Sequence, residues 1–246
     1  MTETRDAKCP GCGEVVQVAL CDPADGAAAL LNRIDLWCDA CFAREKRRKD
    51  QQELARQLQM RTSDLIRARL LPENFREYRF RDALPDVQRR YPHEVRQAAE
   101  WDGQGVLYLA GPHGTGKTSL ARCVLRKLFV HKLDAAEVSA RDLIWRATRF
   151  GDEYWFRDVI RKPVLLIDDL DKVEVDEKRL EALWEVFDKR LGKSTILTAN
   201  VALGGVAKLW QGKAGRNSSL VSATLDRFNP VTEIVIKGES LRKGKD

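Results

Sequence analysis

The chain has 246 residues, with 43 Lys and Arg, 37 Asp and Glu, six cysteines and 43% hydrophobic residues. Its length exceeds the commonest domain size of roughly 100–150 residues, so we expect one large domain or a domain with an appendage. No apolar run approaches the roughly 18 residues that cross a membrane, and the N-terminus has no apolar signal segment. These features argue against a membrane-spanning or secreted protein, and we expect a cytoplasmic protein without membrane contact.

The first feature in chain order is a group of cysteines. Four of the six form two C-x-x-C pairs that are 25 residues apart: Cys9 and Cys12, then Cys38 and Cys41. Each pair can fold as a knuckle whose thiolates point at one ion, and disulfides are disfavoured inside cells. We therefore predict a structural Zn²⁺ site, without an open coordination position for chemistry, in a zinc-ribbon-like domain over residues 1–43. Two unrelated thiol pairs or a redox pair are the alternatives, and Cys21 could in principle replace a ligand.

A basic helical linker is predicted over residues 44–69. These residues carry 9 basic and 4 acidic side chains, whereas residues 1–43 carry 3 and 7. The stretch has no Pro or Gly, and its apolar residues recur at roughly helical spacing: Leu54, Leu58, Leu65 and Ile66. Pro72 ends this pattern of one or two amphipathic helices, so the main domain is expected over residues 70–246. The basic run at residues 44–49 is either a solvated helix face or a contact with nucleic-acid phosphates.

A phosphate-binding loop follows the first strand of the main domain. Residues 106–110 (VLYLA) are typical of a buried strand, and residues 111–118 (GPHGTGKT) match G-x-x-x-x-G-K-[ST] ahead of a helical pattern. Glycines let backbone N–H groups approach the phosphates of ATP, Lys117 reaches the β- and γ-phosphates, and the Thr118 hydroxyl ligates Mg²⁺. A structural glycine-rich turn is the alternative. The predicted ATP-binding residues are Gly111, Pro112, His113, Gly114, Thr115, Gly116, Lys117, Thr118 and Ser119.

Two later strand patterns end in polar residues. The first ends in Asp168 and Asp169, at the edge where ligands bind open α/β sheets. We expect Asp168 to orient Mg²⁺ through a water molecule and Asp169 to polarise the attacking water, with a supporting or helix-capping carboxylate as the alternative for Asp169. Asp171 is expected outside the direct contacts. The second pattern, residues 194–199, is followed by Asn200, which could hydrogen-bond the γ-phosphate or the attacking water or simply mark a turn.

A further helical pattern begins near residue 218 and ends at Arg227. In that position Arg227 could reach the γ-phosphate of a neighbouring subunit as an arginine finger. The alternative is a surface ion pair with Asp226 or Glu233. Arg216 is the second candidate for the finger.

The order of these motifs resembles that of the AAA+ ATPases, and within them the DnaC/DnaI-type helicase loaders and the related IstB-type transposition helper ATPases. The motifs that carry the resemblance lie at residues 71–75, 80–82, 109–118, 138–143, 165–170, 197–200, 226–228 and 238–242. The resemblance implies an α/β fold, a P-loop NTPase with a central parallel sheet flanked by helices, preceded by the small four-cysteine zinc-binding domain and the helical linker. Most AAA+ proteins have Glu where this chain has Asp169, but this branch often has Asp there, so the resemblance is compatible with ATP hydrolysis, including slow hydrolysis. Only 19 residues follow Arg227, so we expect no separate lid domain, and Arg242 is a weak sensor candidate.

The resemblance also implies a function. It predicts an ATP-dependent loader that self-assembles, binds single-stranded DNA, and loads or remodels a DnaB-type hexameric helicase during DNA replication, with the zinc domain as docking module. The alternatives are an IstB-like helper ATPase that coats duplex DNA, and a zinc-ribbon DNA-binding adaptor that does not hydrolyse ATP. The segment 138–163 mixes basic and aromatic residues suited to single strands, although such aromatic residues are also ordinary core material. They are Arg141, Trp145, Arg146, Arg149, Phe150, Tyr154, Trp155, Phe156 and Arg157.

Overall fold

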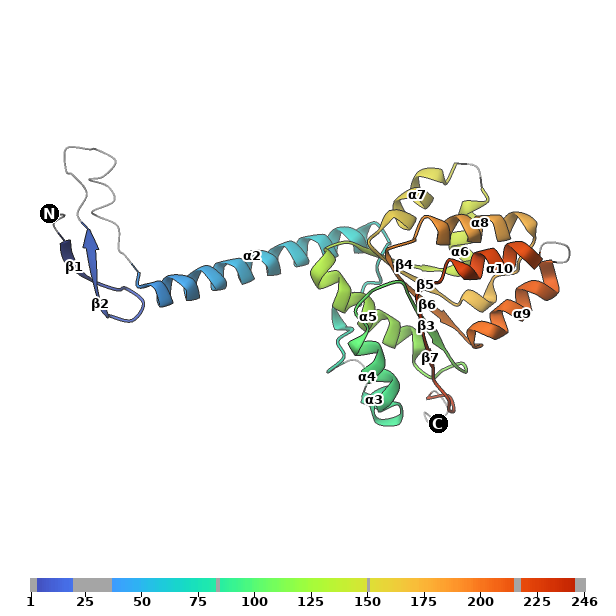
Figure 1. Cartoon of the computed structure of the whole chain (residues 1–246), viewed down its shortest axis with the longest axis horizontal. Helices are drawn as coiled ribbons and strands as arrows, with labels where there is room; N and C mark the ends of the chain where they lie inside the picture. Colours follow the sequence, from blue (N-terminus) through green and yellow to red (C-terminus); the bar gives the residue numbers. More distant parts are fainter. Residues whose placement is uncertain (1–3, 20–36, 83–84, 150, 215–217, 242–246) are drawn as a thin grey trace. The chain divides into compact units, whose positions relative to one another are not determined.

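The computed structural model describes residues 4–19, 37–82, 85–149, 151–214 and 218–241 (Figure 1). They divide into two compact units, within residues 1–59 and 60–246. Helix α2, Asp39–Arg67, contributes residues to both units, so the expected domain boundary after residue 43 falls inside a helix. Four residues considered above lie outside the described residues: Cys21, Phe150, Arg216 and Arg242.

The N-terminal unit contains a two-stranded hairpin and has little apolar core. Strands β1 (Thr4–Lys8) and β2 (Val15–Ala19) pair in antiparallel fashion. The turn between them is closed by a hydrogen bond of 2.8 Å from the Cys9 amide to the Glu14 carbonyl. Among the described residues of this unit, the buried side chains are three cysteines, with Val16 packed against them. So few apolar contacts do not stabilise a fold by themselves. A covalent cross-link or a bound metal ion is needed in addition.

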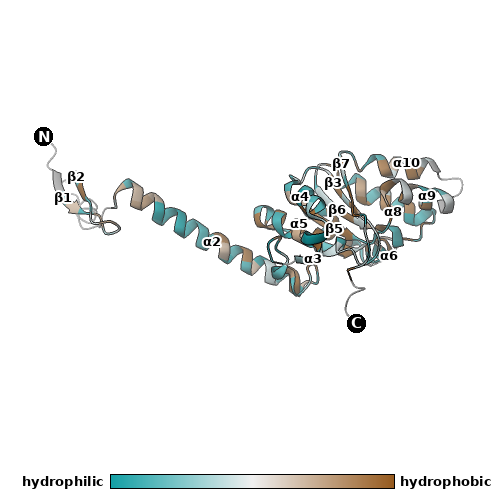
Figure 2. Cartoon of the chain, turned by 90° about the horizontal axis from the view of Figure 1, so that it is seen from below, coloured by the Kyte–Doolittle hydropathy of each residue, from teal (hydrophilic) through white to brown (hydrophobic). Residues whose placement is uncertain are grey.

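Helix α2 is a single continuous helix of 29 residues where the sequence predicts one or two. Pairs on its surface stabilise it, such as Arg48 with Glu45 at 2.6 Å and Gln57 with Glu53 at 3.0 Å. The helix is mostly hydrophilic along its length (Figure 2). It ends shortly before Arg69, whose φ of +57° is incompatible with further helix. No helix in the described part of the chain has the length and apolar character needed to cross a membrane.

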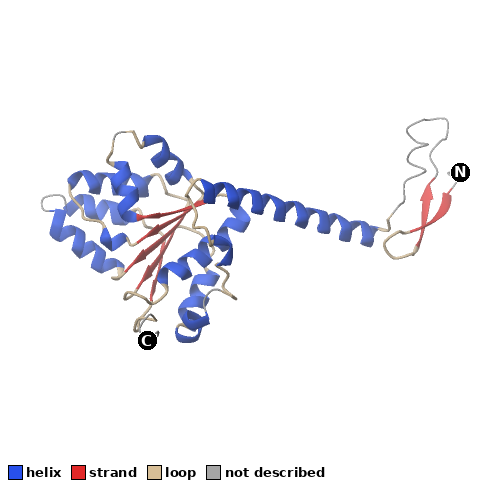
Figure 3. Cartoon of the chain, turned by 180° about the vertical axis from the view of Figure 1, so that it is seen from behind, coloured by secondary structure: helices blue, strands red, loops and turns tan. Residues whose placement is uncertain are grey.

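The second unit is built around a parallel sheet of five strands in the order β4-β5-β6-β3-β7 (Figure 3). The strands are β3 (Val106–Ala110), β4 (Ala135–Ser139), β5 (Val164–Asp168), β6 (Ser194–Ala199) and β7 (Val231–Val235). Strand β3 is buried throughout and pairs with β6 on one side and β7 on the other. Its near-continuous apolar sequence is typical of a parallel strand that helices cover on both faces. The predicted α/β fold with a central parallel sheet is confirmed.

Helices cover both faces of this sheet (Figure 1). They are α3 (Pro85–Arg90), α4 (Pro92–Glu100), α5 (Lys117–Lys132), α6 (Ala140–Ala147), α7 (Glu153–Arg161), α8 (Glu177–Asp188), α9 (Leu203–Ala214) and α10 (Ser218–Asp226), with short 3₁₀ turns η1 (Phe75–Glu77) and η2 (Leu170–Lys172). Helices α3, α4 and α5 lie on one side, and α8, α9 and α10 on the other. The core on the second side includes Phe187 and Phe228, whose ring centroids lie 4.4 Å apart. Strands β3, β5 and β6 therefore present their carboxyl ends at one edge between two packed layers.

Candidate nucleotide-binding site

The phosphate-binding loop connects β3 to α5 in a conformation that requires glycine. Gly111, Gly114 and Gly116 have φ values of +150°, +78° and +90°. A Cβ at Gly111 would also lie 2.5 Å from the carbonyl oxygen of Ile236, which follows β7. The loop ends where α5 begins at Lys117. The unpaired backbone N–H groups at the N-terminus of α5 therefore point toward the centre of the loop. Strand, loop and helix therefore form an anion site.

Lys117 is held over this loop by hydrogen bonds. Its ammonium group donates to the carbonyl oxygens of Gly111 and Pro112 at 2.7 and 2.8 Å, and to Asn200 Oδ1 at 3.2 Å. The residue is 6% exposed, and this burial lowers the pKa of Lys117, while Asp169 and other nearby carboxylates oppose the shift. A phosphate that enters the loop would replace neutral carbonyl partners with anionic oxygens, which are stronger acceptors for a buried cation.

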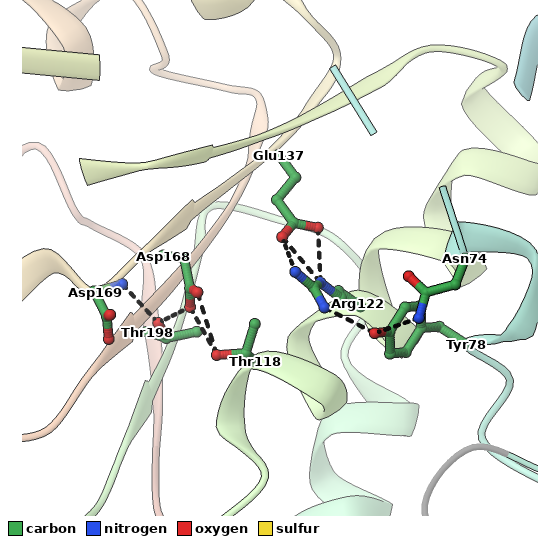
Figure 4. Close-up of polar contacts among 8 residues, drawn as sticks. All are labelled: Asn74, Tyr78, Thr118, Arg122, Glu137, Asp168, Asp169 and Thr198. Atoms are coloured by element: carbon green, nitrogen blue, oxygen red, sulfur yellow. Dashed lines mark hydrogen bonds and ion pairs between the residues drawn. The ribbon is translucent and has the colours of Figure 1, made fainter. Parts of the chain in front are cut away.

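Thr118 and Asp168 meet across the gap between α5 and β5 (Figure 4). The Thr118 hydroxyl donates to the Asp168 carboxylate at 3.0 and 3.2 Å. Adjacent oxygen ligands of an octahedral Mg²⁺, each about 2.0–2.1 Å from the ion, lie about 2.9 Å apart. The spacing of these two oxygens therefore fits Mg²⁺, which would take the place of the hydroxyl proton between them.

Thr198 connects the two acidic residues at the end of β5 (Figure 4). Its hydroxyl donates a short hydrogen bond to Asp168 Oδ1 and accepts one of 2.9 Å from the backbone N–H of Asp169. Asp169 has a left-handed backbone with φ +59°, which is uncommon for a residue with a side chain. Its carboxylate is exposed and has no hydrogen-bond or ion-pair partner among the described residues. Partial burial, together with Asp168 and Asp171, raises the pKa of Asp169.

Asn200 directly follows β6, which lies between β3, the strand before the phosphate loop, and β5, the strand that ends in Asp168. Asp171 lies behind it. The Asp171 carboxylate accepts hydrogen bonds from the Asn200 backbone N–H at 3.0 Å and from its Nδ2 at 3.1 and 2.9 Å. Sequence reasoning missed the roles of Thr198 and Asp171. A hydroxyl within a buried strand was the available signal for Thr198.

Arg227 follows α10 and contacts α8. Its Nε donates to Asp188 Oδ1 at 2.8 Å, and its guanidinium lies 5.7 Å from the ring centroid of Trp184. The ion-pair partner is therefore Asp188, whereas Asp226 or Glu233 was considered from sequence. The Arg227 side chain is 34% exposed. Among the described residues, the other predicted catalytic residues lie at or near the phosphate loop, whereas Arg227 lies against α8.

Comparison with known proteins identifies the family. A family model described as IstB-like ATP binding protein matches residues 32–246. The chain belongs to this family. No curated protein matches it. The resemblance to IstB-type ATPases that the motifs indicate is confirmed, and the family is described as ATP-binding.

Solved structures provide a second comparison for this IstB-like protein. The DnaC helicase loader is 23% identical, with 66% of this chain and 99% of that chain covered and a TM-score of 0.48. DnaI is 20% identical, with 63% and 87% covered and a TM-score of 0.48. A putative primosome component from Streptococcus pyogenes serotype M3 is 19% identical, with 69% and 91% covered and a TM-score of 0.50. The similarity to the primosome component shows that this chain and that protein share a fold.

A group of polar residues anchors the helix that carries the phosphate loop (Figure 4). Arg122 on α5 donates to Glu137 on β4 at 2.6 Å and to the Tyr78 hydroxyl at 2.7 Å. Asn74 donates to the same hydroxyl at 3.2 Å. Burial alone would lower the pKa of Arg122, but Glu137 more than offsets it and the pKa is raised. The segment ahead of α3 is thereby fixed to the phosphate-loop helix.

Helices α6 and α7 place some of the predicted DNA-contact residues on the surface. Trp145 and Tyr154 are 50% and 87% exposed, whereas Phe156 is buried and belongs to the core. The guanidinium of Arg149 lies 4.2 Å from the ring centroid of Trp145, and that of Arg146 lies 4.3 Å from Trp155. A cavity of about 190 Å³ beside α6 is lined by Arg141, Ile144, Trp145, Lys172, Val173, Glu174 and Arg179.

The four cysteines of the N-terminal unit converge. Their sulfur atoms lie within 4.8 Å of one another, and Cys12 and Cys38 are 3.6 Å apart. Tetrahedral zinc with Zn–S bonds of about 2.3 Å would place sulfur atoms about 3.8 Å apart, so the cluster fits Zn²⁺. Burial would raise the pKa of Cys9, but backbone N–H groups, led by that of Cys38, lower it to about 6. Contact with the other thiols, led by Cys12, raises the pKa of Cys41 to about 12. Four thiolates at this spacing repel one another, and a cation between them would stabilise all four in that form.

Proposed function

We propose that this IstB-like protein is an ATP-hydrolysing helicase loader. The observation that carries the hydrolytic part is the meeting of Thr118, Asp168 and the exposed Asp169 at one edge of the sheet. Thr118 and Asp168 would hold Mg²⁺ on the β- and γ-phosphates, which neutralises charge as the terminal phosphoryl group transfers. Lys117 would pair with the same phosphates.

Asp169 is the residue that we assign to the attacking water. The Thr198 hydroxyl holds its backbone N–H at 2.9 Å, while its carboxylate has no partner among the described residues. A fixed backbone with a free, exposed carboxylate suits a group that accepts a proton from water. The raised pKa of Asp169 makes the carboxylate a better proton acceptor than an ordinary Asp.

Arg227 would complete the site of a neighbouring subunit. Its partner Asp188 is partly exposed, as is Arg227, with side-chain exposures of 38% and 34%. A partly exposed pair can exchange for a phosphate at modest cost, because exposed ion pairs contribute roughly 0–1 kcal/mol. We therefore assign Arg227 to the arginine finger of an ATP-dependent homo-oligomer.

The DNA-binding part of the proposal rests on α6 and α7. Trp145 and Tyr154 offer exposed aromatic faces for bases, and Arg149 adds a cation beside Trp145. Aromatic stacking with nearby cations is the usual basis of single-strand binding. We assign single-stranded DNA to this surface and a DnaB-type helicase to the N-terminal unit, where Trp37 and Phe42 are exposed.

The family model, which is that of IstB-like proteins, supports a second candidate function. In this alternative the chain coats duplex DNA and positions a transposase. The basic run at residues 44–49 supports it, since these side chains lie on an exposed part of α2 and fit phosphates. The two functions share the ATP site and differ in partner.

Hydrolysis assays with added partners test these proposals. We expect Mg²⁺-dependent release of phosphate by the wild-type protein, no release by Lys117→Ala because ATP binding is lost, and ATP binding without turnover by Asp169→Asn. Single-stranded DNA and a DnaB-type hexamer should raise the wild-type rate, and the hexamer should be retained by the immobilised protein. Stimulation by duplex DNA alone, without retention of the hexamer, would favour the transposition function. A wild-type protein that binds ATP but never hydrolyses it would contradict both.

A further inference from the structure

A buried carboxylate outside the predicted site controls a residue inside it. We propose that Asp171 is a positioning residue that fixes the Asn200 side chain with its carbonyl oxygen toward the reaction centre, so that Asn200 acts as a hydrogen-bond acceptor for the attacking water. The inference rests on the proposed hydrolysis of ATP and assigns a role within it.

Asp171 determines which end of the Asn200 amide faces it. An ionised carboxylate only accepts hydrogen bonds. Nδ2 of Asn200 lies 2.9 and 3.1 Å from the two Asp171 oxygens, and the Asn200 backbone N–H donates to Oδ1 at 3.0 Å. The Asp171 side chain is only 7% exposed, so water is largely excluded as an alternative partner. Turning the amide over would place its oxygen against the carboxylate, which is repulsive.

Lys117 determines the same orientation from the other side. An ammonium group only donates hydrogen bonds. Its Nζ lies 3.2 Å from Asn200 Oδ1, so the amide oxygen is the atom that points toward the phosphate loop. A donor-only group and an acceptor-only group thus flank the amide, and they admit one orientation.

This orientation selects between the two roles that the sequence left open for Asn200. The oxygens of the γ-phosphate carry negative charge and no proton, so Oδ1 cannot hydrogen-bond them. A water molecule can donate one hydrogen to Oδ1 and the other to the Asp169 carboxylate, which leaves a lone pair for the phosphorus atom. In the attack, the water oxygen bonds to phosphorus, the bond to the bridging oxygen of ADP breaks, and Asp169 accepts the proton.

The fold explains why Asp171 can serve this purpose. Asp169 adopts a left-handed backbone, and the 3₁₀ turn η2 begins immediately after it at Leu170. This turn lies against β6, where Leu170 is fully buried, and it carries Asp171 to the end of that strand. Lys172 is 3.6 Å from Asp171 and is 45% exposed, so it neutralises part of the carboxylate charge without displacing Asn200.

The test measures ATP hydrolysis and ATP binding in substituted full-length chains. Asp171→Asn offers an NH₂ group as well as an oxygen, so Lys117 alone still favours the original orientation of the Asn200 amide. Once ATP is bound and Lys117 pairs with its phosphates, the amide is no longer fixed. We expect kcat to fall at least about 10-fold while KM for ATP changes less than about 3-fold. Glu181→Gln is the matched control, because it removes one carboxylate charge from an exposed position of α8 and should leave both values unchanged.

A double variant separates positioning from general stability. In Asp171→Asn/Asn200→Asp the donor and acceptor exchange places, and an oxygen again faces the reaction centre. We expect its kcat to exceed that of Asp171→Asn and of Asn200→Asp alone. A kcat for Asp171→Asn equal to that of the wild type, or a double variant that does not exceed both single variants, would overturn the role of Asp171. Absence of hydrolysis in the wild type would overturn the proposed function and with it this inference.

Discussion

Thr198 provides the sharpest test of how the acidic residues are held. The side chain is fully buried, donates to Asp168 and accepts the Asp169 N–H at 2.9 Å. Thr198→Val keeps the branched shape but removes both hydrogen bonds. The expected result is a less stable second unit and a strong loss of the proposed hydrolysis, because the left-handed turn at Asp169 loses the hydrogen bond that fixes it.

The size of the effect follows from the two contacts. A hydrogen bond to a charged group contributes about 1.5–3 kcal/mol, and a donor left without a partner costs about 1–3 kcal/mol. Water can replace part of the hydroxyl, because Asp169 is exposed, so we expect a loss of about 2–4 kcal/mol. For a chain of this size each kcal/mol lowers Tm by roughly 2–4 °C, which gives a decrease of about 4–16 °C.

Thr224→Val is the matched control, to be compared by scanning calorimetry of the full-length proteins. Thr224 is equally buried, and its hydroxyl donates at 2.7 Å to the Leu220 carbonyl within α10. That carbonyl also accepts a hydrogen bond within the helix, so loss of the Thr224 hydroxyl costs at most about 1 kcal/mol of unfolding free energy. Equal melting temperatures for the two variants, with hydrolysis intact in Thr198→Val, would refute the reasoning.

Three further predictions concern zinc, the subunit interface and DNA. Protein purified without chelator should carry about one zinc per chain, and its removal should unfold the N-terminal unit while ATP binding persists; less than about 0.3 equivalents would contradict the site. Arg227→Ala and Lys117→Ala should each abolish hydrolysis, but a mixture of the two proteins should recover part of it. In the mixture the Lys117→Ala subunit contributes the arginine finger and the Arg227→Ala subunit contributes an intact phosphate loop; an inactive mixture argues against action between subunits. Replacing Arg146 and Arg149 with Ala should weaken single-strand binding and reduce its salt slope by about 1.4, since each phosphate contact contributes about 0.7; unchanged binding would place the DNA elsewhere.

Local patterns predicted the parts of the site that depend on chain neighbours. The phosphate loop could be predicted because Gly111, Gly114 and Gly116 are needed for its backbone, and Lys117 and Thr118 follow in fixed positions. The same holds for the four-cysteine cluster, where two tight turns are enough to bring the sulfur atoms together. The sheet was predictable from apolar runs that end in polar residues.

Contacts between distant elements could not be predicted in the same way. Arg227 pairs with Asp188 because α10 packs on α8, and no spacing rule relates residues 39 positions apart. Thr198 and Asp171 acquire their roles from the adjacency of β5 and β6, which is known only once the strand order is known. Arg122 and Glu137 likewise meet because the fold places α5 beside β4.

The acidic motif shows how one short stretch produces three different carboxylates. Asp168 accepts from Thr118 and Thr198 and so fits a metal. Asp169 is exposed and without a partner among the described residues, and its pKa is raised by partial burial and by the adjacent carboxylates. Burial alone would raise the pKa of Asp171 as well, but the hydrogen bonds from Asn200 lower it, so this group stays ionised. Environments that move neighbouring pKa values in opposite directions separate a proton acceptor from a fixed anion. The left-handed backbone at Asp169 makes this possible, because it turns the chain between Asp168 and Asp171. Asp168 therefore faces Thr118, and Asp171 faces the back of Asn200.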